Sequence, residues 1–134
     1  MKPIVWNEIY SVNIEEIDNQ HKELIQIINE LLQTNHKKRN SGVSEFLKKI
    51  RNYATTHFST EEIYFRKFDY PFMKSHIEEH QKFFEELRRI EFRIQNEFGN
   101  HSQILFEFLK DWLIKHILGT DKVYISFFKE KGLN

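Results

Sequence analysis

Apolar residues recur every three or four positions through most of this chain, which is the spacing of helices that bury one face. Short polar stretches containing the few glycines and prolines interrupt the pattern. The pattern predicts four helices, at residues 18–37, 41–66, 71–97 and 101–130. Four amphipathic helices joined by short connections predict an all-α fold, an up-down-up-down four-helix bundle.

Residues 1–17 precede the first apolar stripe and form an N-terminal arm. The arm holds enough apolar area to pack on the bundle, in Ile4, Trp6, Ile9, Tyr10, Val12 and Ile14. Asp18 is the expected N-cap of the first helix. A length of 134 residues suits one core, so we expect a single domain over residues 1–134.

Several side chains on the apolar stripes are ionisable or bind metals. His57 and Glu61 are four residues apart, so they lie about 40° from each other around a helix and point the same way. His76 and His80 repeat this spacing on the third segment. The first and fourth segments add one inward imidazole each. The complete set is His21, His57, Glu61, His76, His80, His116 and Asp121.

Asp121 follows His116 by five residues, which places the two side chains about 140° apart on a regular α-helix. Both can reach one site only if the helix is wound out, bulged or broken between them. We expect this irregularity at Gly119, and a π-type bulge would fit a functional site.

Two carboxylates and five imidazoles in one core indicate metal ions. Burying a carboxylate without a cation costs roughly several kcal/mol of folding free energy. The apolar stripes carry no Lys or Arg that could neutralise Glu61 and Asp121. Seven ligands exceed the roughly four of a tetrahedral zinc, so we expect two ions with bridging carboxylates. Imidazole with carboxylate favours iron over magnesium or calcium and leaves manganese open. A lone histidine on a stripe is usually a core residue, so the hypothesis depends on the whole set. We interpret His36 and His101 as solvated surface histidines.

The composition of the chain excludes several classes of partner and of metal ligand. Lys plus Arg and Asp plus Glu are both 20, and this balance argues against a nucleic-acid or anionic-membrane surface. The absence of cysteine restricts any metal to nitrogen and oxygen ligands. The chain has no apolar run of about 18 residues and no apolar signal core in MKPIVWNEIY, so we expect no membrane span and a cytoplasmic location.

These motifs give the chain a specific resemblance. The segments IDNQHKEL (17–24), HFSTEE (57–62), HIEEHQKF (76–83) and HILGTD (116–121) resemble those of single-domain bacterial hemerythrins, and the similarity extends over essentially the whole chain. The resemblance implies an oxo- or hydroxo-bridged pair of non-heme irons. It implies that His76, His80 and His116 hold one iron, that His21 and His57 hold the other, and that Glu61 and Asp121 bridge them.

The resemblance also implies reversible binding of dioxygen at the open position of the second iron, where it is held as a hydroperoxide. Trp112, Leu113 and Ile25 are the candidates for the wall of the ligand pocket. Ordinary core packing is the competing interpretation for all three.

We therefore expect an oxygen carrier and not an enzyme: a monomer that transports, stores or delivers dioxygen, with an oxygen-consuming enzyme as a possible recipient. The alternatives are a di-iron sensor of oxygen, redox state or nitric oxide, and a di-iron oxidase or peroxidase. The carrier is favoured because no inward acid, tyrosine or extra carboxylate stands out as a proton donor near the site. A purely structural bundle is disfavoured by the buried carboxylates.

Overall fold

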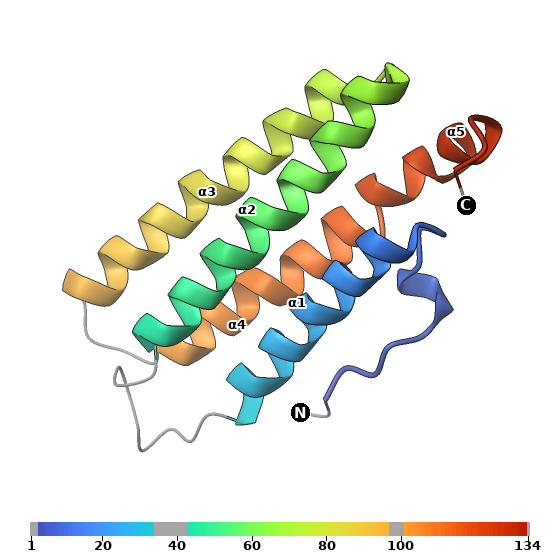
Figure 1. Ribbon diagram of the computed structural model, residues 1–134. Coiled ribbons are helices and arrows are strands. Elements are labelled where there is room, and N and C mark those ends of the chain that lie inside the picture. Colours follow the sequence, from blue (N-terminus) through green and yellow to red (C-terminus); the bar gives the residue numbers. More distant parts are fainter. Residues whose placement is uncertain (1–2, 34–42, 97–100, 134) are drawn as a thin grey trace.

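Four long helices lie side by side in the computed structural model, which describes residues 3–33, 43–96 and 101–133. Figure 1 shows that successive helices run in opposite directions. Within the described ranges the regular elements are helical and none is a strand. The expected all-α four-helix bundle is confirmed. Its helices are α1 (Glu15–Gln33), α2 (Val43–Phe68), α3 (Met73–Asn96) and α4 (His101–Trp112).

The first helix begins before the expected residue 18, and Asp18 is therefore not its N-cap. Asp18 lies in the first turn of α1, where its carboxylate accepts hydrogen bonds from the Ser11 hydroxyl at 2.6 Å and the Val12 amide at 2.8 Å. The backbone amide of Asp18 already donates to the carbonyl of Ile14. Asp18 thus holds the arm against the helix, and this contact depends on the tertiary structure.

The N-terminal arm runs beside α1 (Figure 1). The side chain of Asn29 on α1 accepts from the Ile4 amide and donates to the Ile4 carbonyl, both at 2.8 Å. Trp6 and Tyr10 pack against the core, and Tyr10 is the last residue of the 3-10 helix η1 (Glu8–Tyr10). The arm is therefore part of the folded unit.

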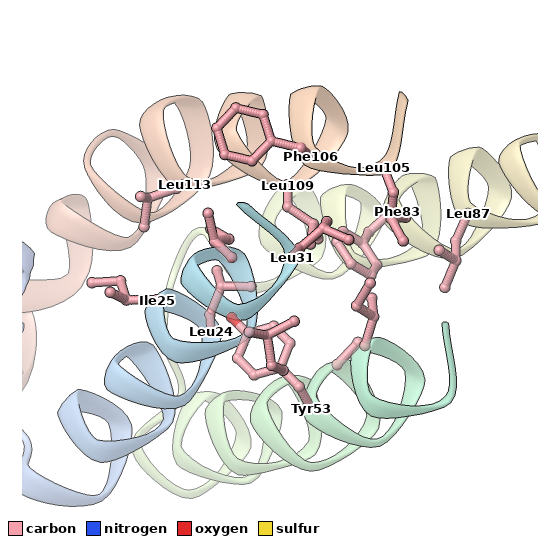
Figure 2. Packing of buried hydrophobic residues seen from close by; sticks show 14 of the residues in the cluster. Leu24, Ile25, Leu31, Tyr53, Phe83, Leu87, Leu105, Phe106, Leu109 and Leu113 are labelled. Carbon is pink, nitrogen blue, oxygen red and sulfur yellow. The ribbon is translucent and has the colours of Figure 1, made fainter. Parts of the chain in front are cut away.

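The apolar interior consists of two clusters. The larger cluster includes Leu24, Tyr53, Phe58, Phe83 and Leu109, and Figure 2 shows part of it packed between the helices. The smaller cluster includes Val12, Ile17, Phe65, Tyr124 and Phe128. Ionisable side chains lie between the two clusters: on α1, His21 follows Ile17 and precedes Leu24, and on α2, Glu61 lies between Phe58 and Phe65. A polar layer therefore crosses the bundle between two apolar regions.

The expected helix over residues 101–130 is divided. After α4 come a π-helix, η3 (Leu113–Ile117), a 3-10 helix, η4 (Thr120–Tyr124), and the short helix α5 (Ile125–Glu130). The amide of Leu118 donates to the carbonyl of Leu113 at 3.1 Å, five residues earlier. The expected irregularity between His116 and Asp121 is present, and its π-helical turn comes before Gly119.

Gly119 is needed where the helix breaks, because a Cβ atom there would clash with the backbone carbonyl oxygen of Lys115. That carbonyl directly precedes His116, so it cannot move without moving the imidazole. We expect Gly119→Ala to lower the free energy of unfolding by about 1–3 kcal/mol and to reduce metal content. Urea unfolding and metal analysis measure both effects. Ile114→Ala, on the exposed side of η3, is the control, and equal losses in both variants would contradict this role for Gly119.

Two histidines, His36 and His101, were interpreted from the sequence as surface residues outside the metal site. The interpretation of His101 as a surface residue is wrong: His101 is the first residue of α4 and is buried. It lies four residues before the fully buried Leu105, so the apolar stripe of α4 starts one turn earlier than expected. His36 lies outside the described residues.

Candidate metal centre

The seven side chains expected at the metal site meet in the polar layer, and each is at most 2% exposed. Their nitrogen and oxygen atoms form two groups that share Glu61, and the atoms of each group lie within 4.8 Å of one another. We call them the three-histidine group (Glu61, His76, His80 and His116) and the two-histidine group (His21, His57, Glu61 and Asp121). The fold thus brings together residues from five helical segments, α1, α2, α3, η3 and η4.

The two carboxylates lie between the groups. Oδ1 of Asp121 is 3.0 Å from Nε2 of both His76 and His116, and Oδ2 is 3.2 Å from Nε2 of His21. Oε1 of Glu61 is 3.0 Å from Nε2 of His80 and 3.4 Å from Nε2 of His57. Each carboxylate therefore approaches imidazoles of both groups, as a ligand that bridges two ions must.

Buried polar atoms without hydrogen-bond partners test whether the cluster suits metal ions. Among the described residues, Nε2 of His57, His76 and His116 and Oδ1 of Asp121 have no hydrogen bond, although they are buried. Buried polar atoms are nearly always paired, so these atoms indicate a missing electrophile. A cation coordinated by these lone pairs would satisfy them, and the residues fit a metal centre.

Four of the imidazoles are oriented by hydrogen bonds on their outer side. Nδ1 of His21 donates to the carbonyl of Tyr10 at 3.2 Å, and Nδ1 of His57 donates to the amide oxygen of Gln20 at 2.8 Å. These oxygens can only accept, so Nδ1 carries a proton and Nε2 is the nitrogen that would bind a cation at the centre. The other two donors are Nδ1 of His80, to Glu62 at 2.9 Å, and Nδ1 of His116, to Glu79 at 3.1 Å.

The outer hydrogen bonds follow the order of the chain. In each case the acceptor lies on an earlier segment of the chain than the imidazole. The N-terminal arm accepts from His21 on α1, and α1 accepts from His57 on α2. In the same way α2 accepts from His80 on α3, and α3 accepts from His116 on η3. Gln20, Glu62 and Glu79 are each adjacent in sequence to one of the seven residues but contact an imidazole of the next helix. A neighbouring residue is turned by roughly 100° on a helix, towards the adjacent helix. This adjacency is the signal that could have identified them from the sequence.

The metal-free cluster balances its charge with protons. Burial opposes a charge on His76 and His116, but the carboxylates of Asp121 and Glu61 outweigh it and raise the pKa to about 9 for His76 and about 10 for His116. Burial and each other's charge also act on Glu61 and Asp121, but the surrounding imidazoles dominate and lower both carboxyl pKa values. Metal ions must therefore displace protons from this site.

Ile25 and Leu113, two of the expected pocket residues, are buried in the larger apolar cluster, on α1 and at the start of η3 (Figure 2). Trp112 stacks on the ring of His116 at 3.9 Å between centroids. It also lines a surface groove of about 330 Å³ beside Glu79. Trp112 therefore contacts the three-histidine group. Tyr53 stacks on His57, and its buried hydroxyl has no hydrogen-bond partner among the described residues.

A tyrosine near the carboxylates is the main residue that sequence reasoning missed. The statement that no inward tyrosine stands out is wrong, because the buried Tyr124 donates to Oε2 of Glu61 at 2.7 Å. Burial, reinforced by Glu61 and Asp121, raises the pKa of Tyr124 well above its ordinary value, so the phenol stays protonated. The apolar pattern that resumes after Gly119 includes Tyr124, but periodicity across the break does not predict that its hydroxyl reaches Glu61.

The fold and this site define a class: four-helix bundles with a buried, histidine-rich centre for metal cations. Residues 12–128 match the family described as "Hemerythrin HHE cation binding domain". The chain therefore belongs to the hemerythrin family, as its motifs indicated.

Individual relatives agree with this assignment. The chain is 30% identical over 128 residues to a bacteriohemerythrin of Pseudomonas aeruginosa, covering 94% of this chain and 82% of the relative. It is 29% identical over 127 residues to a bacteriohemerythrin of Clostridium acetobutylicum, covering 91% and 98%. The crystal structure of a hemerythrin point mutant superposes with a TM-score of 0.71 at 25% identity, covering 92% and 95%. Among the described residues, no helix is long and apolar enough to cross a bilayer.

Proposed function

We propose that this chain is a non-heme di-iron protein that binds dioxygen reversibly, for its transport, storage or delivery. The observation that carries the proposal is the centre itself: seven buried ligand-type side chains in two groups, with unpaired lone pairs facing inward and outer hydrogen bonds orienting the rings. His76, His80 and His116 would hold one iron and His21 and His57 the other, with Glu61 and Asp121 shared. Two ferrous ions would supply the two electrons that reversible binding of dioxygen requires.

The unequal number of imidazoles supports a ligand position at the two-histidine group. With Asp121 counted for both groups because its Oδ1 is 3.0 Å from His76 and His116, the three-histidine group would offer an ion five protein ligands and the two-histidine group would offer four. Ile25 and Leu113 belong to the apolar cluster on one side of this layer. An apolar wall limits the entry of water and protons, and this favours release of dioxygen unchanged over its irreversible reduction.

A di-iron oxidase or peroxidase is the second candidate, and Tyr124 is the observation that favours it. Its phenol lies 2.7 Å from a carboxylate at the centre of the cluster and is a potential source of a proton and an electron. The same hydrogen bond also fits a purely orienting role, in which it fixes the Glu61 carboxylate.

One experiment separates the two candidates. The iron-loaded protein is reduced without air, exposed to dioxygen and then purged while its optical spectrum is recorded. For a carrier we expect a charge-transfer band that forms with dioxygen and is lost on purging, over repeated cycles with constant iron content. A band that decays at once to the oxidised protein, with release of hydrogen peroxide, would favour the oxidase. Chemical analysis for iron and manganese identifies the metal.

A further inference from the structure

The outer hydrogen bonds of the two groups differ in charge. In the three-histidine group, His80 and His116 donate to the carboxylates of Glu62 and Glu79, at 2.9 and 3.1 Å. In the two-histidine group the acceptors are neutral: the carbonyl of Tyr10 and the amide oxygen of Gln20. The bundle therefore places two additional carboxylates behind one metal position, whereas in the described part of the chain both outer acceptors of the other position are neutral.

A carboxylate behind an imidazole strengthens its bond to a cation. It attracts the Nδ1 proton, which increases the electron density at Nε2, and its charge acts directly on the ion. An amide or carbonyl oxygen orients the ring equally well but supplies no net charge. The three-histidine group should therefore bind a metal cation more tightly than the two-histidine group, in addition to having one more imidazole.

We propose that Glu62 and Glu79 are positioning residues that make the three-histidine group the tighter of the two metal positions, so that it fills first. The proposal rests on the ligand assignment given above and not on dioxygen binding. It assigns a role to two residues that the sequence motifs did not single out.

The surroundings of the two carboxylates predict that Glu79 has the larger effect. Glu62 also approaches Arg66, at 3.5 Å on the same helix, and this cation offsets part of its charge. Glu79 accepts a second hydrogen bond, from the hydroxyl of Thr120 at 3.0 Å, which fixes it against η4 one residue before Asp121. Among the described residues, Glu79 forms its ion pair with His116 alone and is also held by Thr120; these two contacts outweigh its greater exposure, 38% against 21% for Glu62.

The test uses cobalt(II) as the probe, added without air to the metal-free protein. Cobalt shifts the proton NMR signals of the imidazoles that bind it. With the first equivalent we expect shifted signals from His80 and His116, and with the second from His21 and His57. In Glu79→Gln, affinity for the first ion should fall roughly 10-fold to 100-fold, and in Glu62→Gln by less.

Two matched variants serve as controls. Glu78→Ala removes an exposed carboxylate next to Glu79 and should leave both affinities unchanged. Gln20→Glu places a carboxylate behind His57 and should narrow the gap between the two positions. Shifted His21 and His57 signals at the first equivalent, or unchanged affinities in a folded Glu79→Gln, would overturn the proposal. If Glu79→Gln does not fold, the loading order of the unmodified chain and Glu62→Gln decide.

The outcomes also separate this inference from the proposed function. A protein that loads cobalt in the expected order but does not bind dioxygen reversibly would support the inference and refute the carrier. A protein that binds no cobalt would refute the ligand assignment, and both proposals with it.

Discussion

Replacing Glu61 by alanine should reduce the metal content from two ions per chain to well below that number. Oε1 of Glu61 lies 3.0 Å from Nε2 of His80, 3.5 Å from His76 and 3.4 Å from His57, so its loss removes an anionic ligand from both groups at once. The measurement is metal analysis of protein purified and loaded in parallel with the unmodified chain. Circular dichroism shows whether the helices still form.

Two variants define what the loss at Glu61 means. Glu61→Gln keeps the shape of the side chain but not its charge, so metal content should fall there too if charge is the decisive property. Glu78→Ala, at an exposed position on α3, should leave metal content unchanged. An unchanged metal content in both Glu61 variants would refute the assignment of Glu61 as a shared ligand.

The metal-free protein should lose stability as the pH rises from neutral to about 10. Burial lowers the pKa values of His76 and His116, but Asp121 and Glu61 outweigh it and raise them from 6.5 to about 9 and about 10. A raised pKa contributes stability that is complete below the unfolded value, near 6.5, and is lost as the pH passes the folded value. The expected loss is on the order of a few kcal/mol, measured by urea unfolding of chelator-treated protein.

The metal-loaded protein is the control for this pH dependence. Its imidazoles bind metal in the neutral form, so its stability should change little over the same alkaline range and should exceed that of the metal-free protein. In acid the loaded protein should weaken as protons compete for the ligands. A metal-free protein with constant stability from pH 7 to 10 would show that its imidazoles are not paired with Glu61 and Asp121 as ions.

Much of this site could be predicted because helical periodicity determines which side chains share a face. Spacings of three and four residues placed His57, Glu61, His76 and His80 on inward faces, and their approach depends only on the helices packing as a bundle. The five-residue spacing from His116 to Asp121 predicted an irregular backbone for the same reason. The structure has a π-helix and a 3-10 helix there.

The contacts that periodicity did not predict are those between neighbouring helices. Glu62 and Glu79 lie on the sides of their helices, and only the relative rotation of α2, α3 and η3 determines that they meet His80 and His116. Tyr124 belongs to the apolar stripe that resumes after Gly119, but its contact with Glu61 was not predicted because it depends on the path of the chain after Gly119. His101 was misjudged because it lies at the first residue of its helix, where a stripe has no preceding turn to define it.

The polar layer between the two apolar clusters determines whether they unfold together or separately. The layer between the larger cluster and the smaller one holds two carboxylates, Glu61 and Asp121, which repel each other unless protons or metal ions neutralise them. Without metal, each cluster is a candidate cooperative folding unit that can open independently. Metal ions then join the two units, and amide hydrogen exchange around Phe65 and Phe128 should slow more on metal binding than exchange around Leu31 and Leu105. The centre that we propose for dioxygen binding would therefore also couple the unfolding of the two apolar clusters.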